Sequence, residues 1–76
     1  MDEIYEMLET LRPEFDFRSS DDFIEDGYLD SFDVVNLVSD LETKYDILID
    51  ALDIMPENFN TVDAIIRLIK KSGGNV

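Results

Sequence analysis

The chain has 76 residues, 45% of them hydrophobic, and contains neither cysteine nor histidine. This length allows one small domain with a single core, and the lack of cysteine excludes disulfides and thiolate metal sites. Nineteen acidic residues against six basic ones give a net charge of −13. Such a charge disfavours binding to nucleic acid or to an anionic membrane, and it attracts basic partners.

The sequence also indicates where the protein works. No apolar run approaches the roughly 20 residues needed to span a bilayer. The first ten residues, MDEIYEMLET, are acidic and resemble neither a signal peptide nor a transit peptide. We therefore expect a cytoplasmic monomer with no stable membrane insertion.

The N-terminal segment has the apolar spacing of one helix face, formed by Ile4, Met7, Leu8 and Leu11. This spacing predicts a helix over residues 2–12. Pro13 ends it, because proline moves the preceding residue out of the helical region.

Residues 13–30 then form a loop that is long for a compact domain, so its own apolar side chains should hold it against the core. We expect Gly27 to adopt unusual backbone angles. The residues expected to hold the loop are Phe15, Phe17, Phe23, Ile24, Tyr28 and Leu29.

A second helix is predicted over residues 31–45, with Asp30 or Ser31 as its N-cap and an acid at position 33 in the first turn. At 100° per residue, one stripe is apolar and should face the core. This stripe comprises Val34, Leu37, Val38, Leu41 and Tyr45. The opposite side carries Asp33, Asn36, Ser39, Asp40 and Thr43.

The C-terminal part is predicted to be irregular over residues 46–59, with a short helical turn at residues 50–54 and a last helix over residues 60–71. Residues 72–76 should form a frayed tail. Apolar side chains expected to turn toward the core before the last helix are Ile47, Ile49, Leu52 and Ile54. The core face of that helix is Val62, Ile65, Ile66 and Ile69. The predicted fold class is all-α: a single domain, 1–76, forming a four-helix bundle with three principal helices and one short helix.

The candidate reactive group is Ser31. A serine needs a neighbouring base to act as a nucleophile, and the usual base, histidine, is absent. We therefore expect no enzyme activity of the chain itself.

A calcium loop is an alternative for the same region, because its spacing of acids partly matches the EF-hand pattern. The match fails at the third position, which is Ile24, and at the twelfth, where Asp33 is too short for bidentate binding. We expect no metal site beyond weak adventitious binding.

Two apolar residues, Phe32 and Val35, lie outside the core stripe of the second helix and close to Ser31. Three interpretations are open: Phe32 folds back onto the long loop, the two side chains are isolated exposed apolar residues without a function, or they form a small contact surface for a partner. The helix N-terminus would also tolerate an anion, such as a phosphodiester on the Ser31 hydroxyl.

The stretch Gly27-Tyr28-Leu29-Asp30-Ser31-Phe32 resembles the motif G-x-x-D-S-[LMF] of the acyl carrier protein family, the phosphopantetheine-attachment domains. The following DVVNLVSDLETKYDILI is similar to the second helix and next loop of that family, and FNTVDAIIRLI to its final helix. The resemblance covers nearly the whole chain.

The resemblance implies a function for the serine. In that family a phosphopantetheinyl transferase with Mg²⁺ attaches 4′-phosphopantetheine from coenzyme A to the motif serine, here Ser31 beside Asp30. The prosthetic group carries acyl or aminoacyl thioesters, and enzymes with basic patches dock on the second helix. Carried over, the docking face comprises Asp30, Phe32, Asp33, Val35, Asn36, Ser39 and Asp40.

This chain departs from the fatty-acid carriers at three positions: Phe32 replaces leucine, Asn36 replaces glutamate and Ser39 replaces methionine. It is closer to D-alanyl carrier proteins and freestanding peptidyl carriers, whose partners are adenylating enzymes. The pathway stays open among fatty acid, polyketide, peptide and D-alanyl carriers. An acidic adaptor without a prosthetic group is the alternative function.

Overall fold

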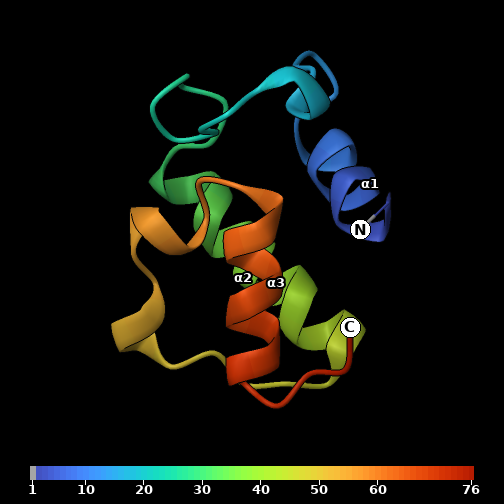
Figure 1. Cartoon of the computed structure of the whole chain (residues 1–76), viewed down its shortest axis with the longest axis vertical. Coiled ribbons are helices and arrows are strands. Elements are labelled where there is room, and N and C mark those ends of the chain that lie inside the picture. The colour runs from blue at the N-terminus through green and yellow to red at the C-terminus, as the bar shows by residue number, and fades with distance from the viewer. Residues whose placement is uncertain (1) are drawn as a thin grey trace.

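The computed structural model describes residues 2–76 and contains three α-helices, labelled in Figure 1. They are α1 (Asp2–Leu11), α2 (Ser31–Tyr45) and α3 (Val62–Lys71). Three short 3₁₀ turns join them: η1 (Phe17–Ser19), η2 (Ala51–Asp53) and η3 (Pro56–Asn58). No strand occurs among residues 2–76, and the predicted all-α class is confirmed.

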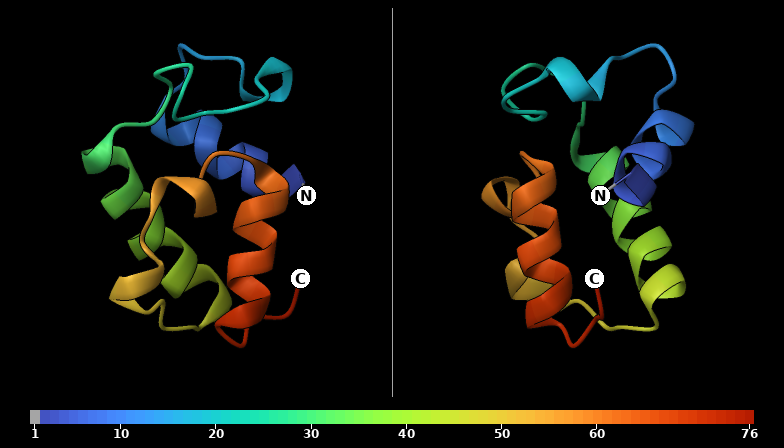
Figure 2. Two further views of the ribbon diagram at one scale, coloured as in Figure 1. Left: turned by 60° about the vertical axis from the view of Figure 1, so that its left-hand side comes forward. Right: turned by 45° about the vertical axis from the view of Figure 1, so that its right-hand side comes forward.

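The helices pack so that α2 and α3 start at the same end of the molecule and run in roughly the same direction (Figure 2). The segment that joins them, with η2 and η3, returns along the outside to the end where both helices begin. The loop between α1 and α2 covers that same end. None of these helices combines the length and the apolar character that crossing a membrane would require.

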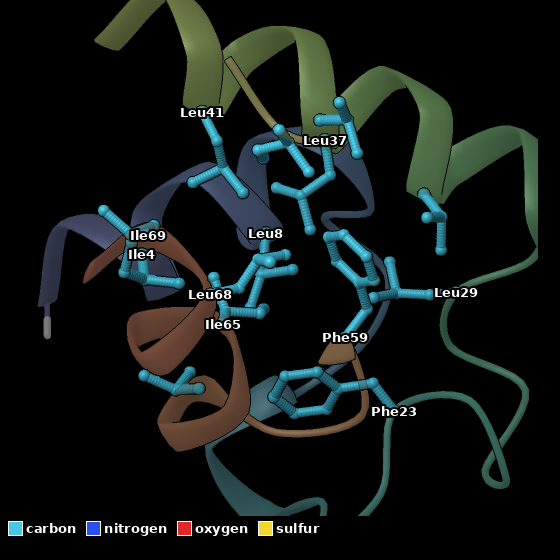
Figure 3. Close-up of a cluster of buried hydrophobic side chains, with 14 of the residues drawn as sticks. Ile4, Leu8, Phe23, Leu29, Leu37, Leu41, Phe59, Ile65, Leu68 and Ile69 are labelled. Atoms are coloured by element: carbon cyan, nitrogen blue, oxygen red, sulfur yellow. The ribbon is translucent and has the colours of Figure 1, made fainter. Parts of the chain in front are cut away.

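The core lies between the three helices, where Leu37 and Leu41 point from α2 toward Leu8 and Ile65 (Figure 3). All four side chains are fully buried. The predicted core stripe of α2 is confirmed, with Tyr45 half-buried at its end. In α3 the buried face also takes in Leu68, which adds to the predicted residues.

The long loop is held by its own aromatic residues, as predicted. The buried ring of Phe17 lies edge-on to Phe23 at 5.1 Å between centroids, and Phe15 stacks on Tyr28 at 4.5 Å. The N–H of Phe23 donates to the carbonyl of Asn60 at 2.8 Å, which ties the loop to the start of α3. The loop, though irregular, is therefore a packed part of the core and fixes the point at which α2 begins.

Gly27 has φ = 76°, in the left-handed region that glycine adopts without strain, so the predicted unusual backbone is confirmed. It ends a turn that starts at Asp22, whose carboxylate accepts from the N–H groups of Ile24 and Glu25.

The segment before α3 departs from the prediction. Ile47 and Ile49 are buried as expected, but Leu52 is 81% exposed and Ile54 is 36% exposed. Residues 50–58 form two 3₁₀ turns rather than one, and the fully buried Phe59 fills the core where these side chains were expected.

The C-terminal residues also depart from the prediction. The N–H of Gly74 donates to the carbonyl of Ile69 at 2.8 Å, and a Cβ on this glycine would meet the Ile69 side chain. The chain therefore folds back onto α3 as far as Gly74, and the predicted fraying from residue 72 is wrong.

Candidate functional site

Ser31 is the first residue of α2 and is exposed to solvent. The preceding Leu29 is buried, and its N–H donates to the carbonyl of Phe23 at 3.2 Å, so the chain enters the helix from a fixed point. None of the hydrogen bonds found among residues 2–76 involves the Ser31 hydroxyl. Ser31 is therefore accessible to solvent, and the chain has no histidine that could act as its base.

The first turn of α2 is closed by a reciprocal pair of hydrogen bonds around Ser31. Asp30 is the N-cap, and its carboxylate accepts from the N–H of Asp33 at 2.9 Å. In return, the Asp33 carboxylate accepts from the N–H of Asp30 at 3.2 Å. This capping box satisfies helix N–H groups that would otherwise lack partners, and it holds the backbone of Ser31 between two bonded residues.

Arg12, which follows the last residue of α1, supplies a cation to this turn. Its Nε donates to Asp33 Oδ2 at 2.9 Å, and its Nη2 lies 3.6 Å from Asp30 Oδ2. Nη1 lies 3.4 Å from Glu14 Oε2. The hydrogen bond to Asp33 raises the pKa of the Arg12 guanidinium above its ordinary value. The bond from the Asp33 N–H lowers the pKa of Asp30, so this cap stays ionised at neutral pH.

Asp33 is only 4% exposed, and among the residues whose burial is described it is the one charged residue in the interior. The sequence placed it on the docking face, and that expectation is wrong. Its carboxylate turns back toward Asp30 and Arg12 because the capping box and the ion pair both use it. Asp33 therefore stabilises the first turn, and its carboxylate is unavailable to partners.

We expect Asp33→Lys to lower the free energy of unfolding by about 2–4 kcal/mol, because it removes the cap and places a second cation beside Arg12. Urea unfolding followed by circular dichroism measures this loss. Asp40→Lys makes the same charge change at an exposed position of α2 and should alter stability by less than about 0.5 kcal/mol. Equal stability of the two variants would contradict the structural role of Asp33.

The apolar residues beside Ser31 are open to solvent: Phe32 is 71% exposed and Val35 is 61% exposed. Phe32 therefore does not fold back onto the loop. A groove of about 220 Å³ lies next to the serine, between the start of α2 and the segment that leads into η3. Its lining is mainly apolar and comprises Ile24, Leu29, Asp30, Ser31, Val34, Val35, Ile54, Met55 and Pro56.

The other residues expected on the docking face lie further along α2. Ser39 and Asp40 are exposed, and Asn36 is half-buried. The calcium alternative gains no geometric support, because within residues 2–76 no three acidic side chains converge as metal ligands would. Asp22 and Asp26 instead take part in local bonds to backbone N–H groups and to the Ser20 hydroxyl.

Two parts of the site are missing from the sequence prediction. Arg12 lies 21 positions before Asp33, and no local pattern connects them. Ile54 and Met55 reach the groove only because the returning segment brings η3 beside the start of α2. The tertiary arrangement alone assembles these residues around Ser31.

Comparison with known proteins identifies the family. The chain is 33% identical over 70 residues to the D-alanyl carrier protein of Leuconostoc citreum (strain KM20), a match that covers 91% of this chain and 90% of that protein. No family model and no solved structure matches the chain. The identity extends over most of both chains, and the chain therefore belongs to the acyl carrier protein family, whose members act as carrier proteins.

Proposed function

We propose that residues 1–76 form a single carrier domain that bears 4′-phosphopantetheine on Ser31 and shuttles acyl or aminoacyl thioesters between enzymes. The observation that carries the proposal is the exposed Ser31 hydroxyl at the N-terminus of α2, in a chain of the acyl carrier protein family. When attached, the group supplies a thiol, which the chain itself lacks because it has no cysteine.

The residues around Ser31 suit a phosphodiester-linked arm. The hydroxyl is accessible to a transferase, and the positive end of the α2 dipole lies at the attachment point. Val35 and Met55 line the adjoining groove and offer apolar surface to the arm, while the Asp30 carboxylate is held by its cap and by Arg12. The chain has no histidine to activate the serine, so in this proposal a phosphopantetheinyl transferase drives the reaction at the hydroxyl, and the chain acts as a carrier rather than an enzyme.

The matched relative is named a D-alanyl carrier protein, and Phe32, Asn36 and Ser39 differ from the fatty-acid type. We therefore assign an aminoacyl cargo, with D-alanine as its first candidate, loaded by an ATP-dependent adenylating enzyme in the cytoplasm. The carrier works as a monomer.

Intact mass spectrometry tests the attachment. The purified chain is incubated with coenzyme A, Mg²⁺ and a broad-specificity phosphopantetheinyl transferase, and one pantetheine adduct is expected. A second known carrier in the same tube proves that the transferase is active. An unmodified chain beside a modified control would favour the acidic adaptor.

We assign partner docking to the exposed residues of the predicted face, Asp30, Phe32, Val35, Ser39 and Asp40, together with the half-buried Asn36. The partner enzymes should present a basic patch with an apolar pocket, since Asp40 lies on the same helix as the exposed Phe32 and Val35.

Reversing one exposed charge should slow docking without unfolding the chain. Asp40→Lys is expected to lower kcat/KM of aminoacyl loading by about three- to tenfold, with a smaller effect at high salt. Asp21→Lys, an equal charge change in the exposed part of the long loop, is the matched control. Equal loading rates for the two variants would contradict the assignment of partner docking to α2.

A further inference from the structure

The ion pairs of Arg12 join the end of α1 to the turn that holds Ser31. The stretch from Asp21 to Asp63 contains many acids and a single base, Lys44. Against this background, Arg12 places a guanidinium in contact with the two carboxylates of the capping box around the serine, Asp30 and Asp33. The contact joins residues 21 positions apart.

The backbone of Arg12 is held in place at the end of α1. Its N–H donates to the carbonyl of Leu8 at 2.9 Å, and the following Pro13 restricts its conformation. The planar guanidinium can then bond Asp33 through Nε while Nη2 lies near Asp30. Asp33 Oδ2 accepts from both Arg12 Nε and the Asp30 N–H, so one oxygen links the arginine to the capping box.

The same contact changes the electrostatic field at the hydroxyl. Asp30 and Asp33 place two carboxylates in the first turn of α2, which begins at Ser31, and coenzyme A is itself an anion. A cation paired with both carboxylates offsets the repulsion that the donor would meet. The burial of Asp33 strengthens the effect, because water screens this pair less than a surface pair.

We propose that Arg12 is a positioning residue for modification of Ser31: it holds the capping box that presents the hydroxyl and offsets the charge of the two carboxylates of that box. The proposal rests on the proposed function. In that reaction the Ser31 oxygen–phosphorus bond forms and the pyrophosphate bond of coenzyme A breaks. The hydroxyl proton passes to a base of the transferase, and adenosine 3′,5′-bisphosphate leaves.

The kinetic test compares Arg12→Met with Arg67→Met, which removes the same charge from an exposed position of α3. With the transferase, Arg12→Met should lower kcat/KM for modification by about tenfold or more, because the hydroxyl is misplaced and the field is more negative. Arg67→Met should change it by less than about twofold. Arg12→Lys restores the charge without the planar group and should recover part of the rate.

A second measurement tests, in the unmodified chain, whether Arg12 stabilises the capping box. Amide hydrogen exchange by NMR should show faster exchange at the Asp30 and Asp33 N–H groups in Arg12→Met than in Arg67→Met, since these groups form the capping box. If Arg12→Met does not fold, Arg12→Met with Asp33→Asn removes both charges and keeps a cap acceptor. This double variant should still be modified slowly.

The outcomes separate the two proposals. A wild-type chain that an active transferase leaves unmodified overturns the proposed function. A wild-type chain that is modified, at a rate that a folded Arg12→Met or the double variant equals, overturns the role of Arg12 alone.

Discussion

Ser31→Ala is expected to abolish phosphopantetheine attachment completely, with no adduct in the intact mass after prolonged incubation with coenzyme A and the transferase. In the proposed reaction the Ser31 hydroxyl is the nucleophile, and alanine has no hydroxyl to replace it. Because Ser31 is exposed and Asp30 rather than Ser31 is the N-cap, the variant should fold as the wild type does. The measurement therefore reports the loss of the attachment reaction without a change in the stability of the fold.

The chain provides a matched control. Ser19 is also exposed, so Ser19→Ala makes the same change away from α2 and from the proposed docking face. It should give one adduct at the wild-type extent. An adduct on Ser31→Ala, or its loss from Ser19→Ala, would assign the attachment to a different residue.

The largest effect on stability is expected in the core between the helices. Leu37→Ala should lower the free energy of unfolding by about 2–5 kcal/mol, because it leaves a cavity at a fully buried position. For a domain of this size such a loss is much of the total stability. Urea unfolding of the unmodified protein measures it directly.

Leu48→Ala is the matched control, since Leu48 is 85% exposed. It makes the same chemical change without a cavity and should shift stability by less than about 0.5 kcal/mol. If the two variants unfold at the same urea concentration, the packing around Leu37 in Figure 3 does not carry the stability of the fold.

The sequence by itself determined the features that depend on neighbours along the chain. The apolar spacing of α2 and the proline after α1 locate these helices, because helix faces and helix ends follow from local geometry. The unusual backbone at Gly27 follows in the same way. Ser31 at the start of an acidic helix could also be found from the motif around it.

The tertiary structure alone decided which charges at the site are available to a partner. Asp33 looks exposed on a helical wheel, but a wheel contains no information on Arg12, which reaches it from the end of α1. The exposure of Leu52 and the position of Met55 in the groove likewise depend on how the segment after α2 returns along the molecule. Contacts between residues far apart in the chain follow from how the whole core packs, and local periodicity does not encode them.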